Sequence, residues 1–337
     1  METKYINNQN WQNFLLNQIE KYDIFSLFVA DENNYNYSKL SSKNLNETVI
    51  GKYRAQVPIK TFFFPPVEKI IPAAEKKPKI IIGIKACELV HLRLFDSIFL
   101  GGEYRDTVYE EARKNTIIIS ADCTSAKECC FCSVIDGQPY ATSGFDINLR
   151  PVGNGFVVEI LSEKGKELVK KNEHLFQDIV QNYIIESERN RRSVNEQVIR
   201  INIKKNINFT KRLNKAVNSV NPEFWNEVSK ECVECGGCRF VCSSCYCFLL
   251  GELPDFEKYR LWDACQFKGY ARVAGGANPK PTKEKRYKNL YSCKFDYRYT
   301  NFGFYACSGC GRCIEVCPAE IDIREVITQI SADEVRR

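Results

Sequence analysis

Two cysteine runs with identical spacing constrain this chain more than any other feature of its sequence. Residues 232–242 and 307–317 both read C-x2-C-x2-C-x3-C. This is the ligand run of bacterial ferredoxins with two [4Fe-4S] clusters, in which the fourth cysteine of each run binds the other cluster. The sequence therefore predicts two clusters in a crossed arrangement. The predicted ligands are Cys232, Cys235, Cys238 and Cys317 for cluster 1, and Cys242, Cys307, Cys310 and Cys313 for cluster 2.

The spacing favours iron–sulfur clusters over the alternative of two zinc sites. Structural zinc is usually bound by two cysteine pairs that lie about a dozen or more residues apart, whereas each run here holds four thiols close together. Pro318 follows the second run, as in bacterial ferredoxins, and Ser243 takes the same place after the first. Glycines inside the runs are expected to let backbone amides approach the cluster sulfur atoms. These glycines are Gly236, Gly237, Gly309 and Gly311.

Cysteines in the first half of the chain form a third group. Cys87 lies at the end of a predicted strand, and a later loop holds Cys123, Cys130 and Cys132. Strand ends in an α/β sheet bring loops together at one edge, so these thiols can complete a ligand set for a cluster 3. Buried free cysteines, which behave as small apolar residues, are the alternative. Cys129 is adjacent to Cys130 and is the alternative to it as a ligand of this group.

A fourth group of cysteines remains after these assignments. They are numerous enough to bind a cluster 4, with isolated thiols near the two main clusters as the alternative. The members of this group are Cys245, Cys247, Cys265 and Cys293.

Composition places the chain in a reducing compartment. The 17 cysteines are bunched, which suits metal ligation better than disulfides. No apolar signal segment follows the first residues, and no apolar stretch reaches the roughly 18–20 residues of a membrane span, so a cytoplasmic protein is expected. The net charge of +6 is dispersed, which argues against nucleic acid as a partner. The basic run at 189–192 is interpreted as a solvated helix face.

The pattern of apolar residues predicts an α+β fold. Short β-branched runs indicate buried strands at 79–84, 116–120 and 156–160, and a helical segment separates the first two. Alternating strands and helices are typical of an α/β domain. We predict three parts: an α/β domain that carries the third cysteine group over residues 1–180, a helical connector over 181–222, and a mainly helical, ferredoxin-like dicluster domain with a loop-rich insert over 223–337.

Several stretches along nearly the whole chain resemble one family of iron–sulfur proteins. The family comprises the β subunit of cytosolic sulfhydrogenases, which are nickel–iron hydrogenases, and the corresponding iron–sulfur subunit of anaerobic sulfite reductase. Glu88 stands where this family usually has aspartate, and a Ser-Ser pair at 243–244 replaces a usual Pro-Thr. The stretches that carry the resemblance are KTFFFPPVE at 60–68, GIKACE at 83–88, CFC at 130–132, WDAC at 262–265, AGG at 274–276 and CSGCGRC at 307–313.

The resemblance implies additional clusters and partners. It extends to the cysteines of the third group and to Cys245, Cys247 and Cys265 of the fourth. At Cys293 the sulfite reductase relatives have histidine, whereas the hydrogenase relatives resemble this chain. The implied partners are a flavin subunit that exchanges electrons with NAD(P)H and a catalytic redox subunit, so a hetero-oligomer is expected.

These features predict an electron-transfer component of an anaerobic oxidoreductase complex, with no catalytic residues of its own. The sequence contains no glycine-rich dinucleotide fingerprint after a strand and no P-loop. It has two histidines, His91 and His174, which argues against histidine-based catalysis. The hydrogenase type of complex is preferred, and the anaerobic sulfite reductase is its alternative. Two other hypotheses are a self-contained iron–sulfur enzyme with its own substrate site and a zinc-binding scaffold.

Overall fold

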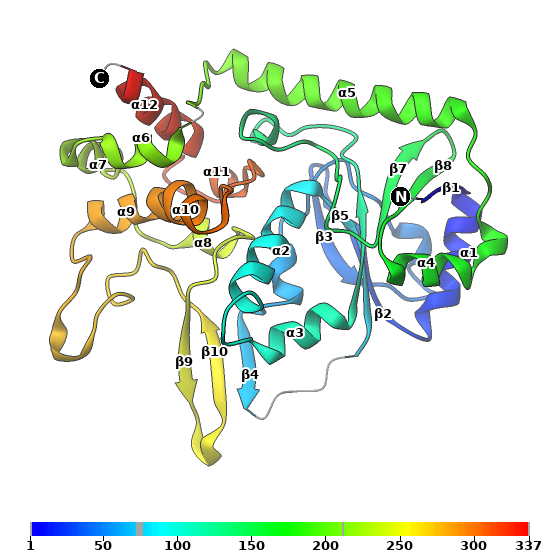
Figure 1. Cartoon of the computed structure of the whole chain (residues 1–337), viewed down its shortest axis with the longest axis horizontal. Helices are drawn as coiled ribbons and strands as arrows, with labels where there is room; N and C mark the ends of the chain where they lie inside the picture. The colour runs from blue at the N-terminus through cyan, green and yellow to red at the C-terminus, as the bar shows by residue number, and fades with distance from the viewer. Residues whose placement is uncertain (1, 72–76, 211, 336–337) are drawn as a thin grey trace.

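A seven-stranded mixed sheet forms the first half of the protein (Figure 1). The computed structural model describes residues 2–71, 77–210 and 212–335. The strand order is β1-β8-β7-β6-β5-β2-β3; the four central strands are parallel, and antiparallel strands flank them. The strands are β1 (Glu2–Asn7), β2 (Asp23–Asp31), β3 (Asn34–Lys39), β5 (Lys79–Ile84), β6 (Thr116–Ala121), β7 (Ile147–Val152) and β8 (Gly155–Ile160).

Helices cover both faces of this sheet, which explains why β5 and β6 are largely apolar. Side chains alternate along a strand, so Ile80 and Ile81 of β5 face opposite sides. One face packs against Phe14 and other residues of α1 and α4, and the other against Phe95 and other residues of α2 and α3. The helices are α1 (Asn8–Ile19), α2 (Ala86–Phe99), α3 (Thr107–Lys114) and α4 (Glu163–Lys170). Because β5 and β6 are parallel, the loops that carry Cys87 and Cys123 leave the sheet at the same edge.

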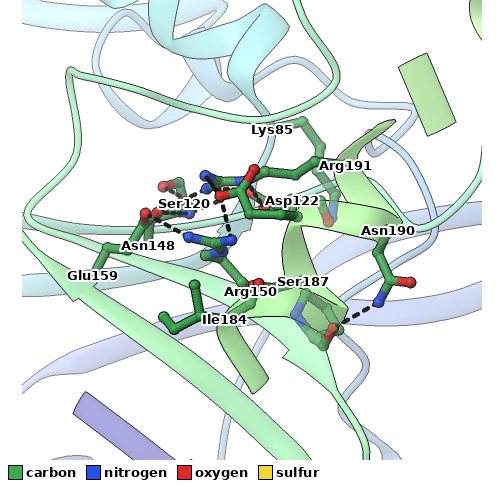
Figure 2. Close-up of polar contacts among 12 residues, drawn as sticks. Lys85, Ser120, Asp122, Asn148, Arg150, Glu159, Ile184, Ser187, Asn190 and Arg191 are labelled. Carbon is green, nitrogen blue, oxygen red and sulfur yellow. Dashed lines mark hydrogen bonds and ion pairs between the residues drawn. The ribbon is translucent and has the colours of Figure 1, made fainter. Parts of the chain in front are cut away.

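The long helix α5 (Gln181–Lys204) runs from the sheet to the C-terminal region (Figure 1). A buried charge network holds it to the sheet, where Arg191 Nε donates to Asp122 Oδ2 at 2.6 Å and Nη2 to Glu159 Oε2 at 2.8 Å (Figure 2). Asn148 Nδ2 donates to both carboxylates, at 3.0 and 2.8 Å. The interpretation of the basic run as solvated is therefore wrong for Arg191, although Arg189 and Arg192 are exposed.

The C-terminal region is built from short helices around a second apolar core. This core contains Trp225, Tyr291 and Ile327, and Phe131 from the cysteine loop after β6 is fully buried in it. The helices are α6 (Leu213–Ser219), α7 (Pro222–Val228), α8 (Gly237–Phe240), α9 (Lys283–Tyr291), a π-helix (Ser292–Tyr297), α10 (Arg298–Phe302), α11 (Arg312–Glu315) and α12 (Ile323–Val335). Among the described residues, no helix is long and apolar enough to span a bilayer.

A small three-stranded sheet joins the two halves of the chain. The hairpin of β9 (Phe248–Glu252) and β10 (Lys258–Trp262) extends from the cysteine-rich region, and β4 (Val67–Ile71) from the first half pairs with β10 (Figure 1). Short 3-10 turns complete the structure at Leu45–Glu47, Ile59–Phe62, Cys132–Val134, Glu173–Leu175, Pro254–Phe256 and Ala274–Gly276.

The predicted fold class is confirmed: a mixed α/β sheet domain precedes a ferredoxin-like region of helices. The three predicted strands correspond to β5, β6 and β8. The sequence analysis missed the other strands of the large sheet and the hairpin in the insert, which it expected to be loop-rich. The division at residues 180 and 222 stays a prediction, and β4 shows that the first and last parts share a sheet.

Candidate iron–sulfur centres

The two cysteine runs adopt the same local conformation. Gly236 and Gly311 both have left-handed backbones, with φ of 75° and 74°, and α8 and α11 begin at the next residue. Only a residue without Cβ adopts this conformation readily. The fourth cysteines, Cys242 and Cys317, lie two residues beyond the ends of these helices. Each run therefore forms a loop, one helical turn and a return toward the other run.

The first cavity is lined by three cysteines of the first run and two of the second, and the second cavity by three cysteines of the second run and the fourth of the first. The first cavity is lined by Cys232, Cys235, Cys238 and Cys317, together with aromatic residues of α9. The second cavity is lined by Cys242, Cys307, Cys310 and Cys313. Cys313, Lys294 and Ile323 line both cavities, so the two lie side by side. The grouping follows the crossed spacing of the sequence.

The thiols of each set surround a cavity, as the ligands of a multi-atom cluster do. The backbone N–H of Ile321 donates to Cys317 Sγ at 3.4 Å. Burial raises the pKa of Cys307 to about 12, while a hydrogen bond from the Gly309 N–H favours its thiolate.

The third cysteine group converges in part. Cys87 is the second residue of α2 and Cys123 follows β6. Burial raises the pKa of Cys87 well above its usual value, and the nearby thiolates of Cys310 and Cys123 raise it further. Burial also raises the pKa of Cys132 to about 12, with a contribution from Cys123. Cys123 thus neighbours both Cys87 and Cys132, and Cys87 also neighbours Cys310, which lines the second cavity.

Cys129 and Cys130 lie together at one side of this group. Hydrogen bonding with Cys130 raises the pKa of Cys129, and Arg54 Nη2 donates to Cys129 Sγ at 3.5 Å. The structure therefore leaves open which of the two completes the third set.

The second run and the third group are in direct backbone contact. The N–H of Phe131 donates to the carbonyl oxygen of Gly309 at 2.9 Å. A Cβ on Gly309 would lie 2.4 Å from the Cys132 nitrogen, and one on Gly311 would lie 2.3 Å from the Cys129 oxygen. Both glycines are needed for this close approach, which the sequence analysis did not foresee. Clusters bound by these two groups would be near neighbours.

The fourth group surrounds the buried side chain of Arg239. Hydrogen bonding with Cys247 lowers the pKa of Cys265 to about 5, so these two thiols are adjacent. Burial lowers the pKa of Arg239, but the nearby thiolates, including those of Cys265, Cys245 and Cys293, together raise it above its usual value. Its Nη2 has no hydrogen-bond partner among the described residues. Cys293 lies in the π-helix, a rare conformation that occurs often at functional sites.

Buried cations among the cysteines are the feature that the sequence analysis missed. Each is at most 4 % exposed, and each lies beside cysteine thiols. A buried cation requires nearby negative charge, which cysteine thiolates can supply, joined by the carboxylates of Glu315 for Arg54 and of Glu88 for Arg312. Their sequence positions give no sign of burial, because charged residues are usually exposed. They are Arg54, Lys60, Lys85, Arg239, Lys294 and Arg312.

Comparison with known proteins identifies the region that holds the two cysteine runs. Residues 231–321 match the family model of the 4Fe-4S dicluster domain. This segment is a ferredoxin-like 4Fe-4S dicluster domain. The dicluster domain contains both cysteine runs and the insert between them.

A curated relative extends the similarity beyond the dicluster domain. The sulfhydrogenase 2 subunit beta of Pyrococcus furiosus is 28% identical over 314 residues, which cover 90% of this chain and 90% of the relative. The resemblance drawn from the sequence stretches is thereby confirmed. The chain is an iron–sulfur electron-transfer protein related to this β subunit, and [4Fe-4S] clusters are its cofactors.

Proposed function

We propose that this chain is the electron relay of a hydrogenase-type complex. Electrons from a flavin subunit that uses NAD(P)H pass through its clusters to a catalytic redox subunit, or flow in the reverse direction. The clusters carry the electrons, and the polypeptide sets their spacing and potentials. In this proposal the cysteine runs bind clusters 1 and 2 in the crossed arrangement, and the third and fourth groups bind clusters 3 and 4.

The observation that carries the proposal is the pair of adjacent cavities, in which three cysteines of one run lie together with the fourth cysteine of the other, while Cys313 borders both cavities. This arrangement serves two clusters that exchange electrons over a short distance. The third group extends the path, because Cys87 neighbours Cys310 of the second run. The fourth group extends the electron path from a different ligand of cluster 2, because Cys245 is hydrogen-bonded to Cys242.

Two buried cations support clusters 3 and 4. Lys85 is fully buried, and its Nζ donates to the carbonyl oxygens of Gly51 and Asp122 at 3.0 and 3.1 Å. Carbonyl groups do not neutralise an ammonium, and the anionic groups near this one are the thiolates of Cys123 and Cys87 and the carboxylates of Asp122 and Glu88. Arg239 is likewise buried beside thiolates of the fourth group, those of Cys265, Cys245 and Cys293.

Access for a partner is provided by a cavity of about 570 Å³ beside α2. Cys87 and Cys132 of the third group and Cys307 of the second run all border it. An electron donor or acceptor at this opening would approach the edges of clusters 2 and 3.

The hydrogenase assignment is supported by the name of the relative, a sulfhydrogenase subunit, and by Cys293, where the sulfite reductase relatives have histidine. The iron–sulfur subunit of an anaerobic sulfite reductase is the second candidate. Co-purification from the native cell under anaerobic conditions distinguishes them: a nickel-containing partner supports the hydrogenase complex, and a sirohaem-containing partner contradicts it.

Iron analysis of paired cysteine variants tests the crossed arrangement. The variant C232A/C317A removes two ligands of one cluster in this proposal, so about four irons per chain are lost. The variant C307A/C317A removes one ligand from each of two clusters, so about eight irons are lost. Uncrossed ligation reverses the two results, and each variant is the matched control of the other.

The anaerobic wild-type protein provides the remaining measurement. About sixteen irons per chain support four clusters, about eight support only the two of the dicluster domain, and zinc in place of iron contradicts the proposal. Reduction by dithionite should bleach the iron–sulfide absorption, and an electron-accepting dye should restore it. Turnover of hydrogen, sulfite or NAD(P)H by the isolated chain would favour a self-contained enzyme instead.

A further inference from the structure

Lys294 is a buried ammonium in contact with cysteines of two different groups. It follows Cys293 in the π-helix and is 4 % exposed. Its Nζ lies 2.9 Å from Cys242 Sγ and 3.6 Å from Cys245 Sγ, and donates to Ser244 Oγ at 3.2 Å. These two sulfur atoms belong to the proposed clusters 2 and 4.

The same residue also reaches the remaining parts of the dicluster domain. Lys294 lines both the first and the second cavity. Its carbonyl oxygen accepts a hydrogen bond at 2.8 Å from the N–H of Ala306, which directly precedes Cys307. The backbone contact fixes the π-helix against the second run, so the ammonium is held between the groups rather than at their edge.

Among the described residues, only the cluster ligands explain why a cation is buried at this position. The acceptors of Lys294 Nζ there are two sulfur atoms and a hydroxyl oxygen, without a carboxylate. The nearby thiolates are Cys242, Cys245 and Cys307, while Arg239 adds a second positive charge. A buried ammonium without negative charge is strongly destabilising, so its partners are the thiolates and the clusters they hold.

We propose that Lys294 is a positioning residue that raises the reduction potentials of clusters 2 and 4 by donating to Cys242 and Cys245. The inference rests on the proposed assignment of these cysteines to two clusters. Each cluster accepts one electron without a proton or a change of bonds, and its negative charge increases by one. A fixed positive charge and a hydrogen bond to a ligand sulfur stabilise that reduced state.

The ammonium also offsets repulsion between the two clusters. An electron on cluster 2 disfavours an electron on cluster 4, because both charges lie in a buried region of low dielectric constant. Lys294 lies between their ligands and is attracted to both charges. Its presence therefore compensates part of the cost of holding an electron on both clusters.

Redox titration of the anaerobic full-length protein, followed by electron paramagnetic resonance, tests this role. In the Lys294→Gln variant we expect the ratio of oxidised to reduced cluster at a fixed potential to rise about tenfold, which is about 59 mV for a one-electron couple. The Lys294→Arg variant keeps the charge but places it over a larger group, so its shift should be smaller and in the same direction. Iron and sulfide contents should equal those of the wild type.

Lys164→Gln is the matched control. Lys164 is exposed, and its Nζ donates to carbonyl oxygens at 2.8–3.3 Å around the start of β6, away from the cysteine groups. Its loss should leave both potentials unchanged.

Unchanged potentials in a Lys294→Gln variant with full iron content would overturn the inference. If the glutamine variant does not retain iron, the Lys294→Arg variant is used for the test. Wild-type potentials of clusters 2 and 4 in the arginine variant would then overturn the inference. Failure of the relay proposal is recognised separately, because it appears as missing iron or as uncrossed ligation in proteins that still have Lys294.

Discussion

At the scale of single residues, one buried ion pair joins the third cysteine group to the second run. Arg312 Nη2 donates to Glu88 Oε1 at 2.7 Å, and both side chains are almost completely buried. The same oxygen accepts the N–H of Ile59 at 2.8 Å. Arg312 Nε also donates to the Ala55 carbonyl oxygen at 2.9 Å. Glu88 follows Cys87 and Arg312 precedes Cys313, so the pair fixes two proposed cluster ligands relative to each other.

Replacing Glu88 with alanine tests this pair. Glu88→Ala leaves the Arg312 guanidinium buried without its carboxylate, so we expect the free energy of unfolding to fall by about 3–5 kcal/mol. Denaturant titration of the anaerobic holoprotein measures the change. The control is Glu163→Ala, which removes an exposed pair with Lys166 and should cost less than about 1 kcal/mol. Equal losses in the two variants would contradict the role of the buried pair.

At the scale of the secondary-structure elements, the docking of α5 depends on one face of the helix. Its buried residues follow helical spacing, and they include both apolar and polar side chains. This spacing places Arg191 on the inner face and Arg192 in solvent, although both belong to the same basic run. The buried residues of α5 are Ser187, Arg191, Val194, Val198 and Asn202.

The variant Arg191→Met tests how α5 is held. It leaves Asp122 and Glu159 buried without their shared guanidinium, so we expect a loss of about 3–5 kcal/mol in the free energy of unfolding. Hydrogen exchange should accelerate most in α5 and in β8, which carries Glu159 (Figure 2). The neighbouring control Arg192→Met should change neither quantity, and acceleration spread evenly over the chain would refute local anchoring.

The same elements show how far the sequence specifies the structure. Apolar β-branched runs at β5, β6 and β8 predict strands because both sheet faces are covered, and so nearly every side chain in them is buried. The strand β3 reads Asn-Tyr-Asn-Tyr-Ser-Lys and is half exposed, so its pattern resembles a polar loop. The spacing of the two cysteine runs is local and visible in the sequence. The third and fourth groups depend on chain segments that only the tertiary fold brings together.

At the scale of the whole molecule, the two halves of the chain interlock at the cysteine groups. Phe131 from the first half lies in the core of the second, and Arg54 Nε donates to the Cys310 carbonyl oxygen at 2.7 Å. Arg324 Nη1 of α12 donates to the carbonyl oxygen of Glu128 at 2.9 Å. The cysteines Cys232 and Cys307 pack directly against the C-terminal core. The proposed clusters therefore lie at the junction, beside the apolar contacts that join the two halves.

Removal of the clusters should unfold one half of the molecule before the other. The short helices α6, α7 and α12 pack on a core that includes cluster ligands, whereas β5 and β6 lie in a sheet with its own apolar cores. Because metal binding stabilises the segments that hold the ligands, iron chelation should lower the protection factors of these helices tenfold or more, about 1.4 kcal/mol. Amide hydrogen exchange of holo and apo protein measures this, and β5 and β6 serve as the internal control. Equal loss of protection in the sheet and the helices would mean that the clusters stabilise the whole chain as one unit.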